Sequence, residues 1–140
     1  MDLSTALDYA RPRRNGVRVT LKSNGRPPLS NISYLVDDDG SIAVSVTADR
    51  AKSRNAVRDP RVSLHVTADD FWSYVVIEGD AHLTPPAAEP GDATVNELVE
   101  LYRRLQGEHP DWDDYRAAMV RDQRLVVRLR PTHVYGMLPS

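Results

Sequence analysis

The segment SVTADRAKSRNAVRDPR, residues 45–61, places an alternating strand directly before a short helix rich in arginine and lysine. Asp49 is a suitable N-cap for that helix, because its side chain can accept from a free backbone N–H. Arg50, Arg54 and Arg58 are spaced four residues apart, so they share one helical face and repel one another. An anionic ligand at the positive end of the helix dipole would relieve this repulsion. The alternative is a basic helix that is simply solvated.

The composition narrows the class of protein. The chain has 140 residues, of which 41% are hydrophobic and 27% are charged, as is ordinary for one globular domain. A formal net charge of −2 makes the basic segment a local feature and argues against nucleic acid or an anionic membrane as partner. The absence of cysteine excludes disulfides and thiolate chemistry. Without a signal peptide or an apolar run of membrane-spanning length, we expect a soluble, cytoplasmic protein with a small-molecule ligand.

Alternating apolar residues between turn signals predict six short strands. In the first, Val17 and Val19 alternate with Arg18 and Thr20. The predicted strands cover residues 17–22, 32–36, 42–46, 62–66, 72–84 and a last one from 125 that Pro131 interrupts. Turns at 23–25 and 37–40 predict that the first three pair consecutively as antiparallel neighbours. Gly79 marks a possible bulge.

Helical spacing appears after a proline-rich loop. It predicts one helix from Ala93 to about Gly107 and a second from Asp111. Together these two helices form an insertion at about 93–122. A weak helical turn is also predicted near the N-terminus. The close strand spacing leaves no room for parallel crossovers, so it favours a mainly β fold with a closed or split antiparallel barrel, in a single domain over 1–140. Side chains fill a barrel of this size, so we expect a ligand outside it, between two subunits.

The common catalytic motifs are missing. No nucleophile elbow, phosphate-binding glycine loop or dinucleotide fingerprint is present, and the four histidines lack metal-site spacing. We therefore expect no catalytic side chain and no metal, and redox chemistry would need a cofactor.

Several motifs nevertheless point to one family. They are residues 24–31, 45–47, 50–55, 59–61, 72–74 and 78–79. Together they resemble the split β-barrel flavin and deazaflavin oxidoreductases related to pyridoxamine 5′-phosphate oxidase, over nearly the whole chain. The run Arg-Ala-Lys-Ser-Arg-Asn, with residues 107–115 and 133–136, is more similar to the branch that uses coenzyme F-420. That coenzyme is an 8-hydroxy-5-deazaflavin with a phospholactyl oligoglutamate tail.

The resemblance implies an oxidoreductase that transfers a hydride between coenzyme F-420 and a small planar or conjugated substrate. It also implies a homodimer with the cofactor at the interface. The implied cofactor-binding residues are Asn31, Ser45, Val46, Thr47, Arg50, Ala51, Lys52, Asn55, Trp72 and Tyr74. Among them, Arg50 and Lys52 would bind the phosphate or acidic tail, residues 31 and 45–47 would line the ring, and Trp72 and Tyr74 would come from the partner subunit.

Alternatives remain both for the roles of single residues and for the function of the whole protein. Trp72 and Tyr74 also suit a core or a dimer interface, and Asn31 beside a turn could bind local backbone groups. The whole protein could be an FMN-dependent reductase or oxidase of the same fold, or a non-catalytic carrier of a cofactor or haem. Pyridoxine metabolism is not expected, because the chain stops soon after His133, where the oxidase has a further arginine and histidine.

Overall fold

The computed structural model describes residues 1–48 and 58–139. The predicted basic helix, with Arg50, Ala51, Lys52 and Asn55, lies outside the described residues. The described elements are α1 (Leu3–Ala10), β1 (Asn15–Val19), β2 (Leu29–Ser33), β3 (Leu35–Val36), β4 (Ile42–Thr47), β5 (Arg61–Thr67), β6 (Tyr74–Leu83), α3 (Ala93–Gln106), α4 (Trp112–Arg121) and β7 (Arg124–Met137).

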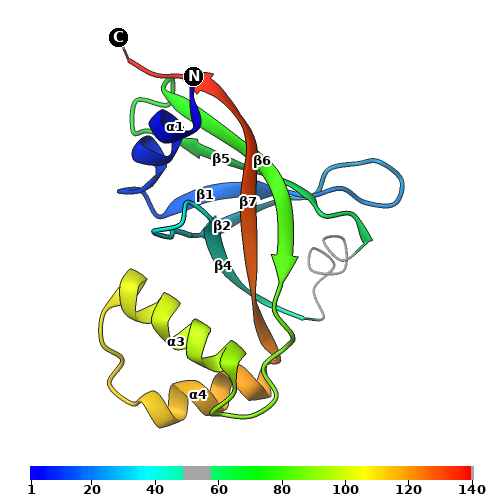
Figure 1. Cartoon of the computed structure of the whole chain (residues 1–140), viewed down its shortest axis with the longest axis vertical. Helices are drawn as coiled ribbons and strands as arrows, with labels where there is room; N and C mark the ends of the chain where they lie inside the picture. Colours follow the sequence, from blue (N-terminus) through cyan, green and yellow to red (C-terminus); the bar gives the residue numbers. More distant parts are fainter. Residues whose placement is uncertain (49–57, 140) are drawn as a thin grey trace.

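The strands form one antiparallel sheet in the order β2-β1-β5-β6-β7-β4-β3. The two end strands of this sheet are consecutive in the chain, separated only by Tyr34. The buried hydroxyl of Tyr34 donates to the Ala10 carbonyl at 2.8 Å, which anchors this link against α1. Because one short segment supplies both ends, the sheet curls (Figure 1). The predicted mainly β, split antiparallel barrel is confirmed.

The predicted pairing of three consecutive strands is wrong in one respect. β1 and β2 do form a hairpin, with Val17 opposite Asn31. The predicted strand 32–36, however, breaks at Tyr34, and β3 pairs with β4 and not with β2 or β1. Among the described residues, the break raises the number of strands from the predicted six to seven. At the break, the fully buried Tyr34 still donates its N–H to the Arg14 carbonyl just before β1 at 2.8 Å, whereas Leu35, the next residue, already pairs with Ala43 of β4.

A bulge interrupts the regular pairing between β6 and β7, the two longest strands of the described residues. The register between β6 and β7 shifts between Glu78 and Gly79, as predicted, and Gly79 lies opposite Pro131. Proline has no N–H to donate to the ladder, and a bulge accommodates it. β7 therefore runs unbroken from Arg124 to Met137, which corrects the predicted interruption at Pro131.

Side chains fill the barrel interior, as the sequence predicts. Val66, Val75 and Ile77 are fully buried there, and a void between core side chains such as Leu64 and Val127 measures only about 10 Å³. The α3/α4 pair packs on the outer face, where Leu98 meets Ala43 of β4 in a second apolar cluster. Figure 1 shows this pair at the end of the sheet opposite to both chain termini. None of the helices in the described residues has the length and apolar character needed to cross a bilayer.

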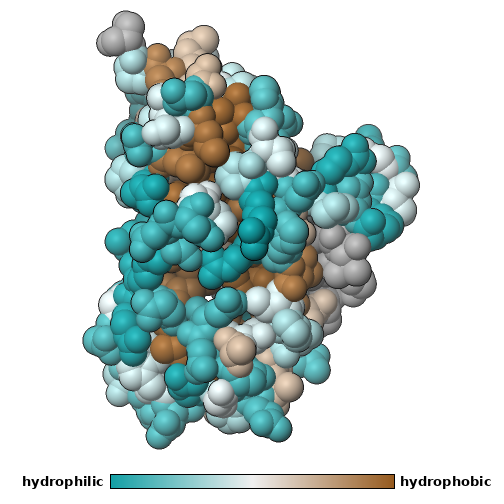
Figure 2. Space-filling view, in the orientation of Figure 1, coloured by the Kyte–Doolittle hydropathy of each residue, from teal (hydrophilic) through white to brown (hydrophobic). Residues whose placement is uncertain are grey.

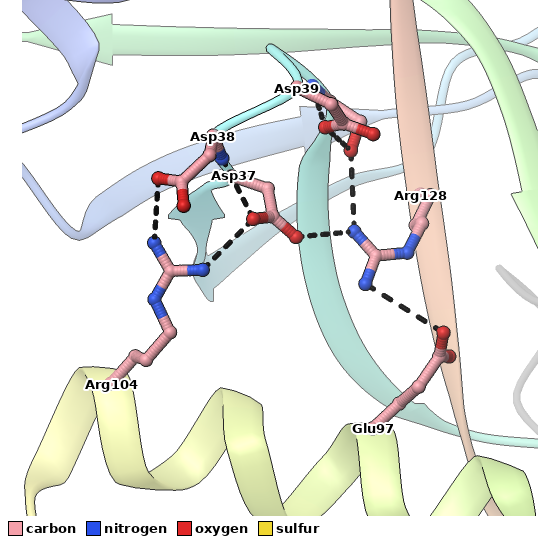
Figure 3. A network of polar contacts seen from close by, with 7 residues as sticks. Asp37, Asp38, Asp39, Glu97, Arg104 and Arg128 are labelled. Carbon is pink, nitrogen blue, oxygen red and sulfur yellow. Dashed lines mark hydrogen bonds and ion pairs between the residues drawn. The ribbon is translucent and has the colours of Figure 1, made fainter.

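Ion pairs tie α3 to the sheet (Figure 3). Arg104 of α3 donates to Asp37, in the turn between β3 and β4, at 2.9 Å. Arg128 of β7 donates to the other oxygen of Asp37 at 3.0 Å and lies 3.8 Å from Glu97 of α3. One carboxylate thus links the helix to two strands and sets the position of α3 over the sheet.

We predict that Asp37→Asn lowers the free energy of unfolding at pH 7 by about 1–2 kcal/mol, because it weakens two charge-assisted hydrogen bonds. Burial raises the pKa of Asp37, but hydrogen bonds from the Asp38 N–H, Arg104 and Arg128 outweigh it and hold the pKa below its ordinary value. This stabilisation is therefore present above the unfolded-state pKa and is lost as the pH falls through the lower folded-state value. Urea unfolding at pH 7 and below about pH 4 measures both effects.

The matched control is Asp38→Asn. The Asp38 carboxylate is 92% exposed and only 3.5 Å from the same Arg104, so we expect a change below about 0.5 kcal/mol. Equal losses in the two variants, or an unchanged pH dependence in Asp37→Asn, would show that Asp37 does not anchor α3.

Candidate functional site

A pocket of about 490 Å³ lies where β2 and β4 diverge, bounded on one side by α3 and α4. Residues from both faces of these strands line the pocket. Ile32 and Val44 face the core, whereas Asn31 is on the exposed face. β2 and β4 are not neighbours in the sheet, so the pocket occupies the gap between them. Its volume is typical of sites for small organic ligands.

Strand edges face this gap. β4 pairs with β7 along its whole length, but with β3 only at Ile42 and Ala43. Among the described residues, the opposite edge of residues 44–46 and the outer edge of β2 therefore have no strand partner. Backbone N–H and C=O groups on such edges are available to a ligand that carries both acceptors and donors.

The helices supply an apolar wall. Leu101 and Leu105 of α3 and Met119 of α4 line the pocket. Figure 2 shows apolar side chains along the seam between the sheet and the helix pair. Tyr115 also lines the pocket, and its hydroxyl donates to the Leu98 carbonyl at 3.0 Å. Burial raises the pKa of Tyr115 to about 12, so this hydroxyl stays neutral at physiological pH.

The caps of the two helices explain why the wall forms here. The side chain of Asp92 accepts from the Val95 N–H at 2.8 Å at the start of α3, and Asp111 accepts from the Asp114 N–H at 3.1 Å at the start of α4. Each cap satisfies a backbone donor that a helix start leaves free. The two helices then pack their apolar faces on β4 and β7.

The polar part of the pocket is basic. Arg18 and Arg124 line it, and no aspartate or glutamate is found among its described lining residues. Arg124 donates to the Ser45 hydroxyl at 3.1 Å. The resulting electrostatic field favours a ligand with anionic or electron-rich oxygen atoms.

Four of the predicted cofactor residues line this one pocket: Asn31, Ser45, Val46 and Thr47. They come from two strands that are far apart in the sheet order, and only the curl brings them together. Their contact with a cofactor stays a prediction. The other four predicted residues on this side of the site, Arg50, Ala51, Lys52 and Asn55, lie outside the described residues.

Trp72 and Tyr74 do not line the pocket of their own chain. They lie at or just before the start of β6, at the end of the sheet near the termini, whereas the pocket adjoins α3 and α4 (Figure 1). Trp72 is 78% exposed, and Tyr74 stacks on His65 with ring centroids 5.4 Å apart. A contribution to the partner's pocket stays a prediction.

The sequence pattern does not predict that Arg18 is buried beside the pocket. Alternation places Val17 and Val19 on the inner face of β1, but the structure buries Arg18 and Thr20, which are 4% and 2% exposed, and leaves both valines half-buried. No sequence signal marks Arg18, because an arginine between two valines ordinarily faces water. Sequence patterns often fail at functional sites, so this mismatch is itself informative.

The curled antiparallel sheet, with a ligand-sized pocket beside its helix pair, defines a split-barrel protein. A family model described as pyridoxamine 5′-phosphate oxidase matches residues 10–138, and the chain belongs to this family. The family binds flavin-type cofactors.

Solved structures share the fold. A conserved hypothetical protein of Mycobacterium tuberculosis, Rv2991, is 24% identical, with a TM-score of 0.74 over 97% of this chain and 84% of that one. An F-420 reductase is 22% identical, with a TM-score of 0.69 over 94% of each chain. The haem storage protein HutZ of Vibrio cholerae is 16% identical, with a TM-score of 0.67 over 97% of this chain and 95% of that one. At these identities the likeness shows the fold alone.

Proposed function

We propose that the protein is an oxidoreductase that transfers a hydride between coenzyme F-420 and a small planar or conjugated organic molecule. One observation carries the proposal: four residues predicted to line the coenzyme ring share a single pocket of about 490 Å³. A flat ring system with carbonyl and ring N–H groups fits a gap between two unpaired strand edges. The flavin-type cofactors of the family support the same class of ligand.

In the proposal, the described residues bind and orient the cofactor and the substrate, and none of them makes or breaks a bond. When bound, the deazaflavin supplies the hydride chemistry. The edges of β2 and β4 would hold the ring, and the apolar wall of Leu101, Leu105 and Met119 would exclude water. Holding donor and acceptor in contact removes several kcal/mol of the barrier. The hydroxyl of Tyr115 is committed to the Leu98 carbonyl, so we assign it a positioning role.

The basic segment begins close to this pocket in sequence. Arg50 follows Thr47 by three residues, and a chain of that length spans at most about 11 Å. In the proposal, Arg50 and Lys52 bind the phosphate and carboxylates of the coenzyme tail, while the ring enters the gap. FMN carries a phosphate but no oligoglutamate, so it would use fewer of these cations.

We also propose a homodimer. Four large side chains near the start of β6 and the end of β7 are strongly exposed: Phe71, Trp72, Tyr135 and Met137, at 68%, 78%, 46% and 63%. Figure 2 shows further apolar side chains at this end of the molecule. Apolar groups gathered in this way favour an interface. In the proposed dimer the two copies lie antiparallel, so that Trp72 and Tyr74 of one copy reach the other copy's pocket.

The alternatives are an FMN-dependent enzyme and a haem carrier. The basic pocket suits FMN as well, and titration with both cofactors distinguishes the two. For haem, none of the described lining residues is a histidine, and no contact favours it.

We predict that the protein binds F-420 at least about tenfold more tightly than FMN, and that Lys52→Ala weakens F-420 binding about tenfold. One charge-assisted contact is worth about 1.5–3 kcal/mol, which corresponds to a tenfold change or more. Fluorescence titration of both cofactors measures the two dissociation constants. Lys22→Ala, which removes the other lysine of the chain from an exposed hairpin, should bind like the wild type. Tighter binding of FMN would favour the alternative, and identical binding by Lys52→Ala would exclude the basic segment from the site.

A further inference from the structure

Arg18 is a buried cation that pairs with no carboxylate among residues 1–48 and 58–139. It is 4% exposed, and its strand pairing sets it opposite Leu64 and Ser30, on the inner side of β1. Within the part of the chain that the structure describes, its Nε and Nη1 atoms have no hydrogen-bond partner and no carboxylate forms an ion pair with it. Burial lowers the pKa of this guanidinium. Such a group destabilises a fold unless something pairs with it.

The unpartnered donors belong to the pocket. Arg18 lines the pocket while remaining buried, so it lies at the floor of the gap between β2 and β4. The hydroxyl of Ser30, its neighbour across the β1–β2 pair, is also buried and unpartnered and lines the same pocket. Arg124, the other described cation of the lining, already donates to Ser45. Arg18 and Ser30 therefore place buried donors, unpartnered among the described residues, directly beneath the pocket surface.

We propose that Arg18 and Ser30 form an anion subsite that binds a carboxylate, phenolate or enolate oxygen of a planar apolar molecule. The apolar body of that molecule would lie against Leu101, Leu105 and Met119, above the charged floor. The oxygen belongs either to the cofactor ring or to the second molecule that reacts with it. The subsite shares its pocket with the proposed function but does not depend on the identity of the cofactor.

Thermal unfolding with benzoate and with benzamide, its neutral analogue of the same shape, tests the subsite. We expect benzoate at saturation to raise the melting temperature of the wild type by about 3 °C or more, and benzamide to have little effect. Arg18→Leu should abolish the difference and Arg18→Lys should keep part of it. Arg130→Leu, which removes an exposed arginine of β7 outside the pocket, should keep all of it. Arg18→Leu alone should raise the melting temperature of the ligand-free protein by about 3–6 °C, because it removes an unpaired buried charge.

A titration of wild type and Arg18→Leu with F-420 separates the two sources of the oxygen. A tenfold weaker affinity in the variant would assign the oxygen to the coenzyme, whereas unchanged affinity alongside the benzoate effect would assign it to the second molecule. If benzoate and benzamide act alike on the wild type, or if their difference survives in Arg18→Leu, the subsite is refuted while F-420 binding can stand. If the benzoate effect depends on Arg18 but F-420 does not bind, the subsite stands and the proposed function fails.

Discussion

Gly79→Ala is expected to lower the free energy of unfolding by about 3 kcal/mol or more, because the new methyl group would overlap the neighbouring strand. A Cβ built on Gly79 lies 2.1 Å from the carbonyl oxygen of Arg130 and 2.7 Å from its carbonyl carbon. Both atoms belong to the backbone, so no side-chain rotation can relieve the contact. The overlap falls at the bulge in the β6–β7 pair, beside Pro131, where the ladder cannot shift further. Urea unfolding measures the loss.

Gly91→Ala is the matched control. A Cβ on Gly91 meets nothing within 4 Å, and its φ lies outside the left-handed region. We expect a change of less than about 1 kcal/mol, in the stabilising direction if the unfolded chain loses entropy. If Gly79→Ala unfolds at the same urea concentration as Gly91→Ala, the strands are not as close at the bulge as described.

Asn31→Trp is expected to remove measurable F-420 binding at micromolar concentrations. Asn31 is exposed on the edge strand β2 and lines the pocket, so an indole there fills the space proposed for the ring. Tryptophan is favoured in strands, and the side chain replaces no buried group, so the fold should persist. The loss would come from steric exclusion and not from unfolding, as the melting temperature would show.

His82→Trp controls for the added indole. His82 is likewise exposed on a strand, β6, but it does not line the pocket. We expect it to bind F-420 as the wild type does. Weakened binding in both variants would point to a general effect of an added indole.

The sequence predicts those elements of the fold that depend on residues close together in the chain. Alternation predicts β5 almost to the residue, and the α3/α4 pair follows from helical spacing that starts at Ala93 and Asp111. These signals depend on neighbours within a few residues. The separation of β3 from β2 does not, because it depends on how the whole sheet curls around Tyr34.

In the candidate site, too, the sequence predicts single segments but not how the fold brings them together. Residues 45–47 stand out by sequence, but their meeting with Asn31 requires the gap between β2 and β4. The sequence marks Tyr115 as a helix position and as the last residue of the 107–115 motif, and it does not single out Leu101; the packing of α3 and α4 makes both part of the pocket wall. Arg18 contradicts the local alternation altogether. Its burial is decided by tertiary structure that no window of sequence contains.

The most direct test of the central claim, that the gap between β2 and β4 holds the coenzyme ring, is a parallel F-420 titration of the wild type, Asn31→Trp and His82→Trp. We expect equal dissociation constants for the wild type and His82→Trp, and no binding by a folded Asn31→Trp protein. Binding by Asn31→Trp at the wild-type affinity would place the ring elsewhere in the molecule.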